Sequence, residues 1–102
     1  GVPPKELRSA ADTILRKLES GVVALVAVNE GKAALVVAVS KDLTDRIDAR
    51  DLVRAGVQAL GGKGGGGRPD FAQGGGPEGA KAQEAVEAVE KALAAQLERQ
   101  IA

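Results

Sequence analysis

The stretch VVALVAVNEGKAALVVAVS, residues 22–40, decides the fold. Two runs rich in β-branched residues, 22–29 and 32–40, are separated by Glu30-Gly31, a short connection that suits a β-hairpin. Apolar residues occupy both faces of the first run, with Val23, Leu25 and Ala27 on one side and Val22, Val26 and Val28 on the other. Strands of this kind usually lie inside a sheet that is covered on both faces. Helices of the same chain, or a partner, must therefore cover this hairpin.

Helical patterns flank the hairpin. Before it, apolar residues recur at helical spacing between Pro4 and Ser20, where Ser20-Gly21 supplies a stop. After it, Asp48 is a candidate N-cap for a second helix that ends at Gly61. A last helix opens at Pro77-Glu78, and its apolar stripe consists of Ala82, Ala85, Val86, Val89, Leu93 and Leu97. We expect this stripe to pack on the chain's own sheet; a helix pair between subunits is the alternative.

The predicted order of elements is α-β-β-α-β-α. The third strand of this order is a short one at Phe71-Ala72, after the second helix. The fold class is a small α/β (α+β) domain in which helices pack on a small mixed sheet. A chain of 102 residues suits one hydrophobic core better than two, so we treat residues 1–102 as a single domain.

The composition excludes most catalytic and metal chemistry. The chain has no Cys and no His, which removes the usual zinc ligands and the base of Ser-His and Cys-His mechanisms. Its acidic residues Asp42, Asp45, Asp48 and Asp51 follow a helix-surface spacing, without a loop that would bring them together. We therefore predict no catalytic residue and no metal site.

Net charge and hydropathy indicate which partners and which cellular location to expect. The 14 Lys and Arg residues balance 14 Asp and Glu residues, so the net charge gives no bulk attraction to nucleic acid or membrane. The apolar runs are far shorter than a membrane span, and no signal-peptide pattern is present. We expect a cytoplasmic location and no membrane contact.

Nine of the 14 glycines fall in GGKGGGGRPDFAQGGG, residues 61–76. The window 52–69 holds Arg54, Lys63 and Arg68 and no acidic residue. Successive glycine N–H groups can converge on phosphate oxygens while the cations supply charge, which predicts phosphate contact. On composition alone a flexible linker is an equal alternative. The spacing does not fit a Walker A loop, because Gly64 follows Lys63 where a hydroxyl residue is required.

Residues 61–75, with VVAVSKDLT at 36–44, closely resemble the signature of the DHHA1 family in the form that aminoacyl-tRNA synthetases carry. The resemblance covers most of the chain. It implies a C-terminal tRNA-binding subdomain, which contacts the outer corner of the L-shaped tRNA and helps the aminoacylation and editing domains engage one tRNA. The implied partners are the tRNA and the other domains of the parent enzyme. That parent is expected to use ATP and magnesium, with zinc in its editing domain, whereas this chain needs no cofactor.

Two other functions stay open. DHH-type phosphoesterases carry a related domain, but their signature typically has a histidine after the glycines, where Arg68-Pro69 stand here. A purely structural role in joining subunits is the second alternative. The family's subdomain is usually preceded by a further strand and a helical dimerisation segment, which we do not find in this sequence. We therefore expect an unpaired sheet edge that is available to another chain.

The predicted RNA contacts lie on and beside the glycine segment. Lys63 and Arg68 are expected to meet the tRNA backbone. Gln73 either hydrogen-bonds RNA or closes a turn, and Arg54 either extends the basic face or pairs with a nearby aspartate. The full set of predicted contact residues is Gly61, Gly62, Lys63, Gly64, Gly65, Gly66, Gly67, Arg68, Gln73 and Arg54.

Neighbouring polar and aromatic residues receive other roles. Arg46 and Arg50 recur with Arg54 every four positions, and intrahelical ion pairs explain this pattern as well as an RNA face does. Asp70 is expected to bond loop N–H groups, since it would repel a phosphate. Phe71 is the sole aromatic residue, and we expect it to anchor the core instead of stacking on a base.

Overall fold

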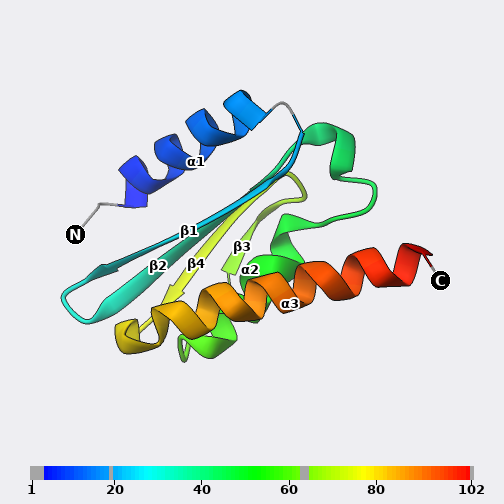
Figure 1. Ribbon diagram of the computed structural model, residues 1–102. Coiled ribbons are helices and arrows are strands. Elements are labelled where there is room, and N and C mark those ends of the chain that lie inside the picture. Colours follow the sequence, from blue (N-terminus) through cyan, green and yellow to red (C-terminus); the bar gives the residue numbers. More distant parts are fainter. Residues whose placement is uncertain (1–3, 19, 63–64, 102) are drawn as a thin grey trace.

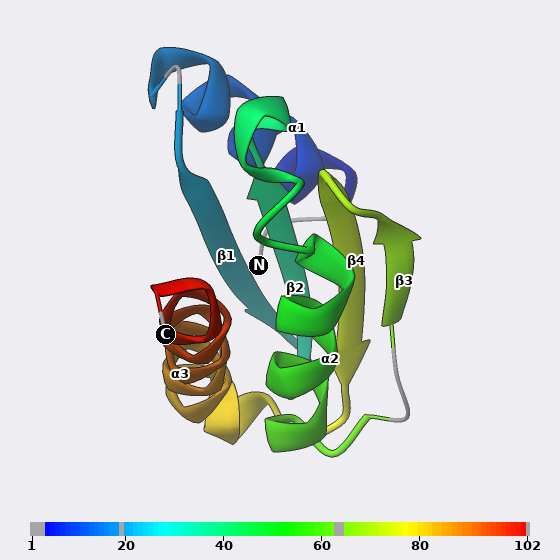
Figure 2. The ribbon, with the colours of Figure 1, turned by 90° about the vertical axis from the view of Figure 1, so that its right-hand side faces the viewer.

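A four-stranded antiparallel sheet lies between helices on both of its faces (Figures 1 and 2). The computed structural model describes residues 4–18, 20–62 and 65–101. The sheet has the order β1-β2-β4-β3 and consists of β1 (Val22–Asn29), β2 (Lys32–Val39), β3 (Gly65–Arg68) and β4 (Phe71–Gly76). The helices are α1 (Pro4–Leu18), α2 (Ala49–Ala59) and α3 (Ala82–Ile101), with short 3-10 turns η1 (Lys41–Leu43) and η2 (Gly79–Lys81).

The predicted β1–β2 hairpin is confirmed, with Glu30 and Gly31 as its connection. Val22 pairs with Val39 at one end and Asn29 pairs with Lys32 at the other. Glu30 and Gly31 have φ values of 53° and 80°, the two positive angles of a type I′ turn. This turn matches the right-handed twist of the strands, so the connection fixes which residues face each side of the sheet.

Two hydrophobic clusters cover the two faces of the hairpin, as its sequence requires. On one face α1 contributes Leu7 and Ala11, which pack with Val23 and Val36. On the other face α2 and α3 enclose a larger cluster, whose members include Leu35, Val37, Leu52, Val53, Val57, Leu60, Ala85 and Val89. The helices of this chain therefore provide cover on both sides of β2 (Figure 2).

Both predicted caps of α2 are present. The Asp48 carboxylate accepts a hydrogen bond from the Arg50 N–H at 2.9 Å, which makes Asp48 the N-cap. At the other end Gly61, with φ of 76°, donates its N–H to Gln58 O at 3.2 Å. Gly62 donates its N–H to Val57 O at 3.0 Å, and the two bonds together form a Schellman motif.

The glycine segment differs from the sequence prediction in one element. Residues 65–68 form a fourth strand, β3, which pairs antiparallel with β4, whereas we expected a loop there. The sheet is also antiparallel throughout and not mixed. Glycine has a low strand propensity, and the strand forms because α2 packs against β3 and β4. The order is therefore α-β-β-α-β-β-α, and the predicted strand at Phe71-Ala72 extends to Gly76.

The last helix packs on its own sheet, as expected. Ala85 and Val89 are buried in the larger cluster, and Leu93 packs against it from the next turn. Pro77-Glu78 is followed by η2, so α3 itself begins at Ala82. Among the described helices, none has both the length and the apolar content needed to cross a membrane.

Candidate nucleic-acid interface

The β3–β4 hairpin is fixed to the rest of the fold at its turn. Pro69 O accepts a hydrogen bond from Ala49 N at 2.9 Å, and Asp70 O accepts one from Val39 N at 2.8 Å. The turn is thus tied to the first residue of α2 and to the end of β2. The backbone of this hairpin is consequently held by the scaffold at its turn, which favours a preorganised surface.

Most glycines of the hairpin are required by packing. A Cβ on Gly65 would lie 2.6 Å from Val53 Cγ1, and a Cβ on Gly74 would lie 2.6 Å from Val57 Cγ2. Both valines belong to α2, so these glycines allow the helix to approach the two strands closely. Gly67 has a φ of 153°, and a Cβ there would lie 2.3 Å from Phe71 O. The glycine content is thus explained mainly by packing on the α2 side.

Gly66 is different, because a Cβ there would meet no atom within 4 Å. It alternates with Gly65 and Gly67, so its open side is the side of the sheet on which α1 lies. Gln73 stands directly opposite Gly66 in the register and is exposed. Arg68 and Phe71 form the next pair on the same side. We call Gly66, Arg68, Phe71 and Gln73 the hairpin face.

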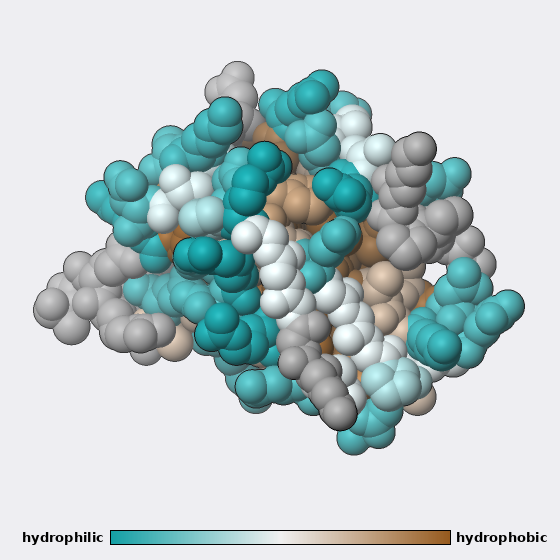
Figure 3. Space-filling model, turned by 180° about the vertical axis from the view of Figure 1, so that it is seen from behind, coloured by the Kyte–Doolittle hydropathy of each residue, from teal (hydrophilic) through white to brown (hydrophobic). Residues whose placement is uncertain are grey.

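The hairpin face is open at Gly66 and Gln73, because α1 lies mainly over β1 and β2. At the Phe71 end of the face, Arg8 of α1 lies over the aromatic ring. Figure 3 shows a pale band of near-neutral hydropathy between hydrophilic groups on the rear of the molecule, as expected for glycine-rich strands without side-chain cover. A bulky ligand can therefore approach the backbone of β3, whose outer edge has no partner strand among the described residues.

Arg68 is the cation of the hairpin face. Its Nε lies 3.5 Å from Asp70 Oδ1, and its side chain is 74% exposed. Asp70 therefore pairs with Arg68, whereas the sequence predicted bonds to loop N–H groups. An exposed pair at this distance contributes little to stability, so Arg68 can exchange the carboxylate for a phosphate at small cost.

A shallow hollow of about 310 Å³ adjoins the hairpin face. It is lined by Arg8, Ser9, Asp12, Arg68 and Phe71. The Arg8 Cζ lies 5.3 Å from the centroid of the Phe71 ring, a cation–π distance. Phe71 itself is half-buried against the α1 cluster, so the prediction that it anchors the core is confirmed. Sequence reasoning missed Arg8, because only the folded sheet brings the first turns of α1 beside Phe71.

Three of the other predicted contacts, Gly61, Gly62 and Arg54, do not belong to this face. Gly61 and Gly62 already donate their N–H groups to α2 carbonyls, so these donors do not point at a ligand. Lys63 and Gly64 lie outside the described residues. Arg54 is on α2, in the layer across the sheet, and its Nη1 lies 3.5 Å from Asp51 Oδ1.

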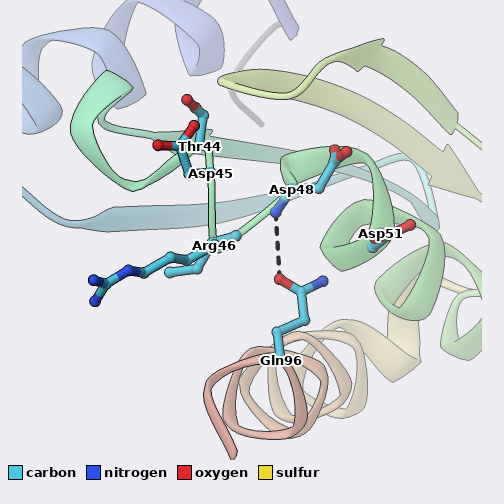
Figure 4. A pocket seen from close by; sticks show the side chains of 7 residues that line it. Thr44, Asp45, Arg46, Asp48, Asp51 and Gln96 are labelled. Atoms are coloured by element: carbon cyan, nitrogen blue, oxygen red, sulfur yellow. Dashed lines mark hydrogen bonds between the residues drawn. The ribbon is translucent and has the colours of Figure 1, made fainter. Parts of the chain in front are cut away.

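A second hollow lies between the start of α2 and α3 (Figure 4). It has a volume of about 340 Å³ and is lined by Thr44, Asp45, Arg46, Ile47, Asp48, Asp51 and Gln96. The buried Gln96 extends from α3, and its Oε1 accepts a hydrogen bond from Asp48 N at 3.3 Å. The three aspartates that line this hollow would repel a phosphate, so the hollow does not suit RNA. Within the described residues, no group of three or more His, Cys, Asp and Glu side chains is placed to hold a metal ion.

Arg50 belongs to the cap of α2. Its Nη2 lies 2.7 Å from Asp48 Oδ2, and its Nε donates to the same carboxylate. This side-chain hydrogen bond is the main reason that the pKa of Asp48 is lowered and the pKa of Arg50 is raised. The ion-pair interpretation therefore accounts for Arg50 and Arg54, the latter through Asp51.

Comparison with known proteins places the chain in a family. Residues 1–95 match the DHHA1 domain. The alanine–tRNA ligase of Granulibacter bethesdensis is 62% identical over 94 residues, which cover 92% of this chain and 11% of the ligase. The alanine–tRNA ligase of Rhizobium meliloti is 61% identical over 95 residues, with the same coverages. The chain thus spans about a tenth of the length of these relatives.

A solved structure gives the same result. The C-Ala domain from Aquifex aeolicus alanyl-tRNA synthetase superposes with a TM-score of 0.83 and 38% sequence identity. The match covers 90% of this chain and 82% of that chain. The family expected from the glycine segment is therefore confirmed. The chain belongs to the DHHA1 family, in the C-terminal form that alanyl-tRNA synthetases carry.

Proposed function

We propose that this chain is the tRNA-binding C-terminal domain of an alanine–tRNA ligase and that it contacts the elbow of alanine tRNA through the hairpin face. The observation that carries the proposal is Gly66. Every other described glycine of residues 61–76 has a packing contact or a positive φ that requires it, whereas Gly66 has neither. Access for a ligand is the remaining reason for a residue without a side chain at this position.

The chemistry of the hairpin face suits an RNA backbone. Gly66 lets phosphate and ribose oxygens approach the outer edge of β3, where backbone N–H groups have no strand partner among the residues that the structure describes. Arg68 supplies a guanidinium for a phosphate, and Gln73 offers an amide that both donates and accepts. Such contacts read backbone shape more than sequence, which is appropriate for a folded RNA corner.

In this proposal the chain binds and performs no chemistry. Alanylation, with ATP and magnesium, and editing, with zinc, belong to other parts of the ligase. The domain would help the aminoacylation and editing domains act on one tRNA by adding a third contact point, which raises affinity through linkage. The resemblance of the chain to alanine–tRNA ligases supports this role over that of a phosphoesterase accessory domain.

A matched pair of arginine substitutions tests the proposal. Arg68 and Arg54 are both exposed, and each lies 3.5 Å from an aspartate, but they occupy opposite layers. We expect Arg68→Gln to weaken binding of alanine tRNA by about 3- to 10-fold, because it removes one charge-assisted phosphate contact. Affinity is measured by fluorescence anisotropy of labelled tRNA at two salt concentrations, with an RNA hairpin that lacks the elbow as the competitor.

Arg54→Gln tests the predicted contact of Arg54. An equal loss of tRNA affinity in Arg68→Gln and Arg54→Gln would mean that the RNA passes around the β3 edge onto α2. A loss with Arg54→Gln alone would show that the hairpin face is not the binding surface. If tRNA and the RNA hairpin that lacks the elbow bind with equal affinity, recognition of the elbow is contradicted.

A subunit-joining role is the second candidate, and the β1 edge favours it. β1 has β2 as its one neighbour in the described sheet, and its residues are uncharged. Val28 on this strand is 43% exposed, in contrast to the charged side chains that usually protect an edge. Light scattering decides between the two roles: a concentration-independent monomer that binds tRNA rules out the joining role, and a stable dimer without RNA affinity supports it.

A further inference from the structure

The hollow between α1 and the β3–β4 hairpin combines features of a nucleotide site. Two guanidinium side chains, Arg8 and Arg68, line the same space together with the aromatic ring of Phe71 and the hydroxyl-bearing Ser9. Its volume of about 310 Å³ is at the lower end of the range for small-ligand sites, which suits a single nucleotide. None of the residues of α1 is among the RNA contacts expected from the sequence.

The charges of the hollow leave Arg8 available to an anion. Among the described residues, Arg8 contacts the Phe71 ring and forms no ion pair. Asp12, the acidic residue of the lining, is compensated by Arg16, whose Nη2 lies 2.9 Å from Asp12 Oδ2. Arg8 therefore keeps its N–H donors. Because Asp70 offsets Arg68, Arg8 is the cation that gives the hollow its local positive charge in a chain of zero net charge.

The ring of Phe71 orients Arg8. A guanidinium that lies over an aromatic face can also stack on a base. RNA-binding proteins use aromatic side chains and arginine planes in this way to hold unpaired bases. Here the aromatic ring is partly buried and the arginine covers it, so the stacking surface offered to RNA is the guanidinium itself.

We propose that this hollow binds one unpaired nucleotide of the tRNA, with its phosphate between Arg8 and Arg68 and its base stacked on Arg8. The inference rests on the proposed function, since it extends the hairpin face by one nucleotide. Arg68 and Phe71 belong to both surfaces, so an RNA strand that passes over Gly66 continues into the hollow without a change of face.

Substitutions on α1 test the site. Arg8→Gln removes the charge and the plane, and Arg8→Lys keeps the charge but removes the plane. Lys17→Gln is the matched control, because Lys17 is exposed on the same helix and does not line the hollow. We expect Arg8→Gln to weaken binding of alanine tRNA by about 5-fold and to reduce the slope of log affinity against log salt by about one. We expect Lys17→Gln to stay within about 2-fold.

Arg8→Lys separates nucleotide binding from simple charge attraction. The salt slope should be unchanged while affinity falls by about 3-fold, because lysine does not provide the stacking plane. A direct probe is adenosine monophosphate, titrated while the Nε–H resonances of the arginines are followed by NMR. The resonances of Arg8 and Arg68 should shift together in the unsubstituted chain, and the shift of Arg68 should weaken in Arg8→Gln.

The outcomes distinguish the two proposals. If Arg68→Gln weakens tRNA binding but Arg8→Gln behaves like Lys17→Gln, the hairpin face stands and the nucleotide site is overturned. If Arg8→Lys binds tRNA as well as the unsubstituted chain does, the stacked base is overturned. If the unsubstituted chain does not bind tRNA, the proposed function fails and the nucleotide site fails with it. Circular dichroism of each variant confirms that the fold is retained, which the exposure of Arg8 leads us to expect.

Discussion

At the scale of single residues, the glycines of this chain serve separate purposes. Gly61 closes α2 with a positive φ, and Gly65 and Gly74 make room for α2 valines. Gly75 approaches β2 so closely that a Cβ would lie 2.4 Å from Ala33 O. Gly66 alone among the described glycines of residues 61–76 faces open space without a positive φ. A glycine-rich sequence can thus be a packing device along most of its length and a ligand surface at one position.

This difference predicts opposite effects of alanine at two positions. Gly74→Ala should lower the free energy of unfolding by about 1–3 kcal/mol, because its methyl group would overlap Val57 in a closely packed contact. Gly66→Ala should raise it by up to about 1 kcal/mol, because alanine loses less backbone entropy than glycine in a strand. Urea denaturation of both variants measures the two changes.

The Gly66→Ala variant also tests whether RNA binding requires a glycine at this position. If Gly66 is needed for close approach, Gly66→Ala should weaken tRNA binding although the protein is at least as stable as before. A Gly66→Ala variant that binds tRNA with full affinity would contradict the argument that access for RNA requires glycine there. Stability and affinity must therefore be measured on the same preparation.

At the scale of elements, α2 is defined by side-chain and backbone bonds at both ends. Asp48 caps its first turn, and the Gln96 side chain of α3 bonds the Asp48 N–H, which links the start of α2 to α3. Gly61 and Gly62 satisfy carbonyls of its last turn. Because Ala49 N also bonds Pro69 O, the position of α2 sets the position of the β3–β4 turn. Stability at the cap is therefore coupled to the shape of the hairpin face.

Removal of this cap should destabilise the domain in a pH-dependent way. Asp48→Ala should lower the free energy of unfolding by about 1 kcal/mol near neutral pH, the usual value for loss of an N-cap. The pKa of Asp48 is lowered in the folded state by hydrogen bonds from Arg50, so its contribution is complete above the unfolded pKa of about 4. The contribution is lost as the pH falls through the lower, folded pKa. Urea denaturation at pH 7 and pH 3 should show a smaller difference between variant and unsubstituted chain at pH 3 than at pH 7.

Asp45→Ala is the control for this experiment. Asp45 is exposed and lines the same hollow between α2 and α3 as Asp48 does, but it does not cap α2. It should have little effect at either pH. If Asp45→Ala lowers the free energy of unfolding as much as Asp48→Ala does, the destabilisation results from the loss of a negative charge and not from the loss of the cap.

At the scale of the whole molecule, the balance of 14 cations and 14 anions limits how the domain can bind RNA. If the domain binds tRNA as proposed, its zero net charge gives no long-range attraction, so binding would depend on the few cations that the fold brings together. Arg68 and Arg8 are adjacent to one hollow although they are far apart in sequence, and they come from different layers. The sheet and α1 together create this local charge.

A shallow salt dependence follows from so few cations. Each phosphate neutralised contributes about 0.7–0.9 to the slope of log affinity against log salt, so Arg8, Arg68 and Lys63 predict a slope of about −2 to −3. A titration of tRNA affinity between low and moderate salt measures it. A slope of about −6 or steeper would require many more phosphate contacts than these three cations provide, and would place the main RNA surface elsewhere.

The sequence alone determined the elements with strong periodicity and the family. The two apolar runs in residues 22–40 specified a hairpin covered on both faces, because side chains of a strand point to its two sides in turn and both sides are apolar here. Asp48 and Gly61 specified the ends of α2 through local capping chemistry. The signature at residues 61–75 specified the family, since its resemblance covers most of the chain.

Only the tertiary structure decided how the glycine segment is used. Strand β3 was not predictable, since four residues of GGGR carry no hydrophobic alternation and their pairing depends on contact with α2. Gly66 faces open space whereas Gly65 and Gly67 are packed, and Arg8 lies over the Phe71 ring. Both features depend on which atoms of distant residues lie next to these positions in the folded sheet. Local patterns record the period of a strand or helix, whereas contacts between residues distant in sequence are set by the packing of layers, and the candidate site is made of such contacts.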